Sequence, residues 1–89
     1  MRKVKILVSG RVQGVYFRYF TQNKAQHFAV KGYAKNLPDG RVEIIAEAET
    51  MVLEKFIDWC RKGPLTARVD AVEITELEVG EALTSFQIK

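Results

Sequence analysis

The sequence predicts an α+β fold with the element order β-α-β-β-α-β, followed by a short fifth strand. Three observations support this prediction. Strand-type and helix-type apolar periodicity alternate along the 89 residues. The segment "LPDG" at residues 37–40 is a typical turn between two strand-type runs. A helix pattern in the second half is closed by Gly63 and Pro64. The length suits one core, so we expect a single domain over residues 1–89.

The first half of the chain accounts for a strand, a helix and a hairpin. Residues 3–9 alternate as a strand, and residues 17–29 carry an apolar stripe close to the helical period. A short strand is expected over residues 32–36. Residues 41–49 alternate well, so these two strands form a hairpin around "LPDG".

The second half predicts a helix and two strands. Thr50 is the expected N-cap of the helix. The strand pattern at residues 68–79 changes parity between its apolar residues, so a bulge or break is expected near Thr75. A last strand is expected over residues 85–89. Two β-α-β units with a hairpin between them give the ferredoxin-like sandwich, an antiparallel sheet with both helices on one face.

Charge is distributed unequally along the chain. Residues 1–41 carry nine Lys or Arg and one acid, a net charge of +8, whereas residues 42–89 carry five Lys or Arg and ten acids, a net charge of −5. The first half therefore favours an anion such as phosphate, nucleic acid or an acidic partner.

The remaining titratable residues indicate little chemistry. Cys60 is the only cysteine and lies on the apolar stripe of the second helix, so we expect a core thiol in a reducing cytoplasm. His27 is expected to be structural or at the surface. No spacing suggests a metal site, and no stretch approaches a membrane span.

Arg18 is out of place as a structural residue. It falls in the first turn of the first helix, where the helix dipole and unpaired N–H groups disfavour a cation. The preceding loop contains Gly10 and Gly14, and such a loop can present several N–H groups to one anion. With a phosphate bound, Arg18 becomes a bidentate clamp, although glycines alone also suit a simple turn.

Asn36 is unusual because asparagine is depleted in strands and the turn is already supplied by "LPDG". In a β-α-β unit both strands run in the same direction, so Asn36 and the loop before Arg18 meet at one edge of the sheet. An amide there can accept a hydrogen from water and donate another to phosphate.

With these residues in view, the chain resembles the acylphosphatase family over its whole length. The first family signature, G-x-V-Q-G-V-x-F-R, is complete at residues 10–18, and the second, G-W-V-x-N-x-x-D-G, is matched at Gly32, Asn36, Asp39 and Gly40. Tyr33 and Ala34 replace the usual Trp and Val of the second signature, which leaves substrate preference and rate open.

The resemblance implies hydrolysis of a small-molecule acyl phosphate to a carboxylate and inorganic phosphate, without a cofactor or a metal. Asn36 would position the attacking water. Arg18 and the backbone amides of one loop would hold the phosphoryl group; the phosphate-binding residues implied are Gln13, Gly14, Val15, Tyr16, Phe17 and Arg18. We expect a monomer that binds neither nucleic acid nor membrane.

Two alternatives remain open. The RNA recognition motif shares this element order, and "KGYA" at residues 31–34 matches the start of its aromatic octapeptide, although on the second strand and not the third. The other alternative is a non-catalytic domain that senses phosphate or acyl phosphate.

Overall fold

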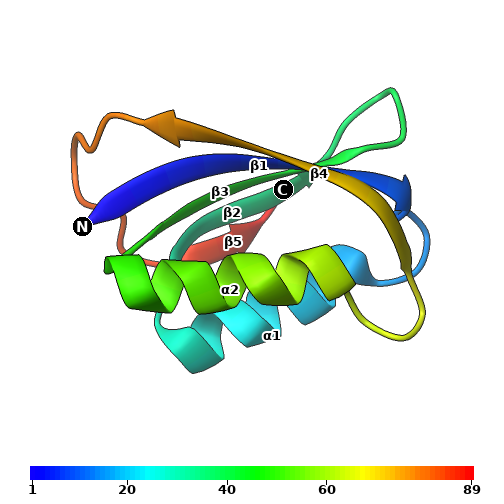
Figure 1. The fold of residues 1–89 in the computed structure, drawn as a ribbon, viewed down its shortest axis with the longest axis horizontal. Helices are drawn as coiled ribbons and strands as arrows, with labels where there is room; N and C mark the ends of the chain where they lie inside the picture. The colour runs from blue at the N-terminus through cyan, green and yellow to red at the C-terminus, as the bar shows by residue number, and fades with distance from the viewer.

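The structure, a computed structural model that describes residues 1–89, has a five-stranded sheet with two helices packed on one face (Figure 1). The elements in chain order are β1 (Arg2–Arg11), α1 (Phe17–Phe28), β2 (Lys31–Asn36), β3 (Val42–Ala48), α2 (Thr50–Lys62), β4 (Arg68–Leu77) and β5 (Phe86–Ile88). The predicted ferredoxin-like order and the short fifth strand are confirmed.

The strand order in the sheet is β4-β1-β3-β2-β5. The pairs β4–β1, β1–β3 and β3–β2 are antiparallel, as predicted, whereas β5 pairs with β2 in parallel. The sheet is therefore mixed. The cause is the connection after β4, which reverses the chain direction and brings β5 to the edge farthest from β4.

The prediction of a bulge or break near Thr75 is wrong. β4 stays in register with β1 from Val72 to Leu77, and the register shift lies at the step from Ser9 to Gly10. Leu77 lines a cavity on the sheet face away from the helices, which explains its change of parity without a bulge. The shift at Gly10 lets Val69 pack against the same core as Val72.

The predicted N-cap of the second helix is also wrong by one residue. Thr50 is the first helical residue, and Glu49 takes the extended cap conformation, with φ −61° and ψ 150°. No side chain caps this helix, so the preference of threonine for N-caps is not used here.

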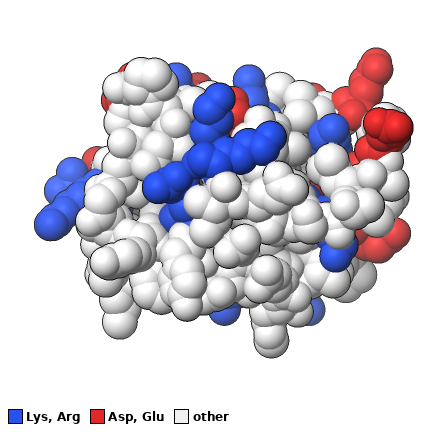
Figure 2. Space-filling model, turned by 180° about the vertical axis from the view of Figure 1, so that it is seen from behind, with Lys and Arg blue, Asp and Glu red and all other residues white.

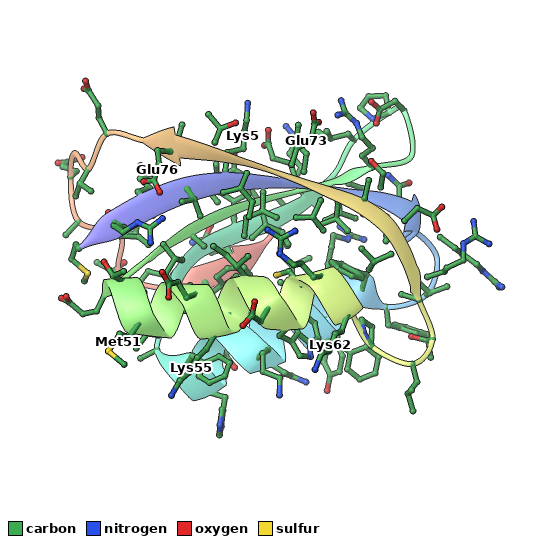
Figure 3. The ribbon with its side chains drawn as sticks, in the orientation of Figure 1. Lys5, Met51, Lys55, Lys62, Glu73 and Glu76 are labelled. Carbon is green, nitrogen blue, oxygen red and sulfur yellow. The ribbon has the colours of Figure 1, made fainter.

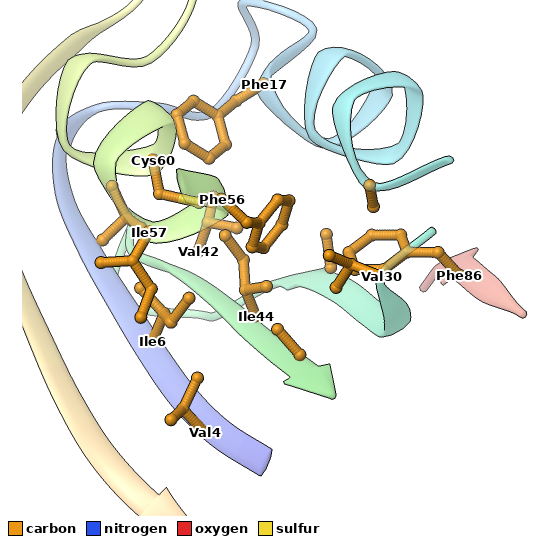
Figure 4. Packing of buried hydrophobic residues seen from close by; sticks show 14 of the residues in the cluster. Val4, Ile6, Phe17, Val30, Val42, Ile44, Phe56, Ile57, Cys60 and Phe86 are labelled. Carbon is orange, nitrogen blue, oxygen red and sulfur yellow. The ribbon is translucent and has the colours of Figure 1, made fainter. Parts of the chain in front are cut away.

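The core lies between the sheet and the two helices as one cluster of 18 buried residues. Figure 4 shows Phe56 and Ile57 of α2 above Ile6 and Ile44 of the sheet, with Phe86 of β5 beside them. The other face of the sheet carries charged side chains: in Figure 3, Lys5 and Glu73 point away from the helices. Neither helix is long and apolar enough to cross a membrane.

Candidate active site

The β1–α1 loop and the end of β2 meet at one edge of the sheet, as the topology predicts. They enclose a cavity of about 370 Å³. Its lining residues are Val12, Gly14, Tyr16, Phe17, Arg18, Tyr19, Asn36 and Ile88. Arg18 and Asn36, which are 18 residues apart in the sequence, therefore line the same cavity.

The backbone of the loop takes left-handed conformations at two positions. Gly14 has φ 74° and Tyr16 has φ 62° with ψ 23°. Gly14 has open space around it, so its conformation and not crowding is what favours glycine there. For Tyr16 the left-handed conformation costs about 1 kcal/mol or more. Such residues turn successive N–H groups towards one point, the geometry of an anion nest.

The start of α1 leaves backbone donors without partners. The first intrahelical hydrogen bond is donated by the Phe20 N–H to the Tyr16 carbonyl, at 3.1 Å. No side chain caps this end, and no acidic residue lies in the first turn. The N–H groups before Phe20 and the positive end of the helix dipole are therefore open to an anion.

Arg18 is half-buried and held from one side only. Its Nη1 donates a hydrogen bond to the Lys89 main-chain oxygen, at 2.6 Å. Lys89 is itself held by its N–H, which donates to the Ala34 carbonyl at 2.8 Å, and by its ammonium group, 4.2 Å from the centre of the Tyr33 ring. A guanidinium has five N–H donors, so this arrangement orients Arg18 and leaves donors for a ligand.

Asn36 ends β2 opposite Val42 of β3. Its Oδ1 atom is buried and has no hydrogen-bond partner in the protein. A buried acceptor without a donor costs about 1–3 kcal/mol, so a water molecule in the cavity is the natural partner.

Two of the predicted phosphate-binding residues do not line the cavity. Val15 is buried in the core, and its carbonyl accepts a hydrogen bond from the Thr66 hydroxyl at 2.8 Å. The Gln13 side chain bonds to the β2–β3 hairpin instead. Sequence reasoning missed Ile88 as a lining residue, because only the pairing of β5 with β2 brings it to the cavity.

Basic side chains gather on one face of the molecule. Figure 2 shows Lys and Arg side chains in the middle of the face that carries α1 and β5, with most Asp and Glu towards one edge. Arg18 is the only charged residue that lines the cavity. No acidic side chain lines the cavity. The structure gathers no group of three His, Cys, Asp or Glu side chains that could hold a metal ion.

Cys60 and His27, which the sequence predicts to have no role in the chemistry, both lie away from the cavity. Cys60 is a free, fully buried core thiol, and burial raises its pKa. His27 is exposed at the end of α1, beside the Phe28 ring.

Fold and cavity together define a class: a ferredoxin-like α+β protein whose loop–helix junction is suited to an anion. Comparison with known proteins narrows the class, because residues 4–88 match the family model described as Acylphosphatase. The chain belongs to the acylphosphatase family and is therefore a hydrolase.

Individual relatives agree. The acylphosphatase of Archaeoglobus fulgidus is 48% identical over 99% of this chain and 98% of its own. The crystal structure of the Bacillus subtilis acylphosphatase superposes with a TM-score of 0.95 at 39% identity, covering 100% of this chain and 99% of that one. The structure of HypF from T. kodakarensis contains a similar region, with a TM-score of 0.87 and 36% identity over 12% of its length.

Proposed function

We propose that this protein hydrolyses acyl phosphates with Arg18 and the loop amides of residues 13–18 as the phosphoryl-binding groups and with Asn36 as the residue that positions water. One observation carries the proposal. The same cavity is lined by a cation at an uncapped helix start and by a strand-end amide whose buried oxygen has no partner.

In the proposed reaction, a water oxygen attacks phosphorus and the bond from phosphorus to the acyl oxygen breaks. The products are a carboxylate and inorganic phosphate. A carboxylate leaving group with a pKa of roughly 4 leaves without being protonated, so no acid is needed beside it. Catalysis then consists of positioning and charge stabilisation, which a guanidinium and N–H groups supply without a metal ion.

In the proposed reaction Asn36 positions the water and Arg18 binds the phosphoryl group. The Asn36 oxygen accepts a hydrogen from the attacking water, which gives the buried acceptor its partner. Arg18, fixed from behind by Lys89, presents its remaining donors to the phosphoryl oxygens, where negative charge is concentrated.

The acyl group would lie against the apolar side of the cavity. Tyr16, Tyr19 and Ile88 line the cavity and remain well exposed, so apolar or aromatic acyl groups can cover them. Tyr33, which replaces the family's usual Trp, points to the other face of the sheet and reaches Arg18 only through Lys89. The replacement thus affects the site indirectly.

The two alternatives receive less support. The Tyr33 ring, which RNA stacking would need, is covered by the Lys89 ammonium group and its hydroxyl donates to Glu43 at 2.9 Å. A sensor would need no water-positioning amide, yet Asn36 is present. We propose further that residues 1–89 act as one monomeric domain in a reducing cytoplasm, where a free thiol such as Cys60 persists.

The deciding experiment is hydrolysis of benzoyl phosphate in the presence of EDTA, followed by its loss of absorbance. We expect turnover that EDTA does not lower and that inorganic phosphate inhibits competitively. Phosphate binding without turnover would indicate a sensor. Absence of both, with salt-dependent binding of single-stranded RNA, would favour the RNA-binding alternative.

A further inference from the structure

The side chain of Gln13 connects the β1–α1 loop to the β2–β3 hairpin, although it does not line the cavity. Its neighbours Val12 and Gly14 both line the cavity, but Gln13 does not. Its amide nitrogen Nε2 donates to the Leu37 carbonyl at 2.8 Å and to the Arg41 carbonyl at 2.9 Å. Both hydrogens of the amide are thereby used.

The two accepting carbonyls form the neck of the β2–β3 hairpin. The Leu37 N–H also donates to the Arg41 carbonyl, at 2.8 Å, just beyond the last ladder pair of Asn36 with Val42. Gln13 therefore binds the residue that directly follows Asn36. No other side-chain hydrogen bond connects the β1–α1 loop to this hairpin.

Gly14 lies between the buried residues Val12 and Val15, but its own backbone has φ 74° and no heavy atom within 4 Å of where a Cβ atom would lie. Side-chain hydrogen bonds on both sides of Gly14 tie the loop to other segments. On the far side of Gly14, the Thr66 hydroxyl bonds to the Val15 carbonyl and ties the loop to the segment before β4. Gln13 is the corresponding tie to the strand that carries Asn36.

We propose that Gln13 is a positioning residue, whose side chain sets the separation between the phosphoryl-binding loop and Asn36. This inference rests on the function proposed above for Arg18 and Asn36. In-line attack requires the water and the leaving oxygen on opposite sides of phosphorus, so movement of the hairpin relative to the loop misaligns the water while phosphate still binds.

The first test is Gln13→Met, which keeps the length of the side chain and removes both donors. We expect kcat for benzoyl phosphate to fall about 10- to 100-fold, as misplacement of a reacting group predicts. The Kd for inorganic phosphate should change little, because Arg18 and the loop amides remain. Gln22→Met is the matched control, since Gln22 makes a similar bond to the Phe86 carbonyl, at 3.0 Å, away from the hairpin; its kcat should stay near that of the unmodified protein.

Gln13→Glu keeps the test decisive if the methionine variant folds poorly. At neutral pH the introduced carboxylate faces two carbonyl oxygens and repels them. As pH falls towards the carboxyl range of about 4, protonation restores one donor, so the deficit in kcat relative to the unmodified protein should shrink. A deficit that is constant with pH would contradict the proposal.

Combining Gln13→Met with Asn36→Ala separates this inference from the proposed function. If Gln13 acts through Asn36, its substitution has little further effect on kcat once Asn36 is removed. Additive losses would overturn the positioning role, as would an unchanged kcat in Gln13→Met, a parallel loss of phosphate affinity, or an equal loss in Gln22→Met. Full turnover in both Arg18→Ala and Asn36→Ala would instead overturn the proposed function itself.

Discussion

The two helices pack on the same face of the sheet, but their ends differ in electrostatics. At α2, Glu49 occupies the N-cap position and Arg61 and Lys62 lie in the last turn, so both ends complement the helix dipole. At α1, the first turn contains Arg18 and no acid, and a left-handed tyrosine precedes it. α1 therefore sacrifices local stability at its N-terminus, where a ligand anion would restore it.

The two helices also differ in the size of the side chains that they bury. α2 buries Leu53, Phe56, Ile57 and Cys60, whereas α1 buries Phe17 and two smaller residues, Thr21 and Ala25. Figure 3 shows the outward residues of α2, among them Met51, Lys55 and Lys62, directed to solvent. We infer that α2 mainly stabilises the fold and that α1 mainly forms the site, and the substitutions below test that division.

The largest effect is expected for Arg18→Ala. Loss of the guanidinium should lower kcat/KM for benzoyl phosphate by about 10³-fold or more, because the charge of the phosphoryl group loses its main partner. The free energy of unfolding should change by less than about 1 kcal/mol, since relief at the helix dipole offsets the lost bond to Lys89. Phosphate should raise the melting temperature of the unmodified protein and not of the variant; a normal phosphate response in Arg18→Ala would refute the clamp.

Phe56→Ala should lower the stability of the fold and leave phosphate binding intact. Phe56 is fully buried, with its ring centre 6.1 Å from that of Phe86. Its removal should lower the free energy of unfolding by about 3–5 kcal/mol in urea titration. The folded fraction should retain its phosphate affinity. Phe20→Ala, on the partly exposed side of α1, is the control and should cost less than about 1 kcal/mol.

Asn36→Ala should separate turnover from binding. We expect kcat to fall about 100-fold, comparable to removing one aligned polar group in other active sites, while the affinity for inorganic phosphate changes little. Steady-state kinetics and calorimetric phosphate titration measure the two quantities. If both fell together, Asn36 would be a binding or structural residue.

The smallest effect is expected for Tyr19→Ala. Tyr19 lines the cavity from the first turn of α1 and is about half exposed. Its removal should lower kcat/KM for benzoyl phosphate relative to acetyl phosphate by about 3- to 10-fold, because the aromatic acyl group loses apolar contact area. Met51→Ala, at the matching end of α2, should leave this ratio unchanged. An equal fall for both substrates would argue against an acyl contact.

Much of the site follows from the sequence because its anomalies are local. A cation at a helix start and an asparagine at a strand end are each visible within a few residues. One general rule, the common direction of the two strands in a β-α-β unit, brings Arg18 and Asn36 to the same edge. The contacts between distant segments could not be predicted. Examples are the hydrogen bond from Gln13 to the hairpin and the position of Ile88 in the wall of the cavity.

The sequence by itself determined the order of the elements, the burial pattern of the helices and the two segments that line the candidate site. Periodicity, turn chemistry and dipole preferences act over a few residues, which is why these features can be predicted from the chain alone. Only the tertiary structure decided the parallel pairing of β5, the register shift at Gly10 and the anchoring of the loop by Gln13. Each depends on groups that are distant in the sequence, and the order and register of the strands in the sheet bring these groups into contact.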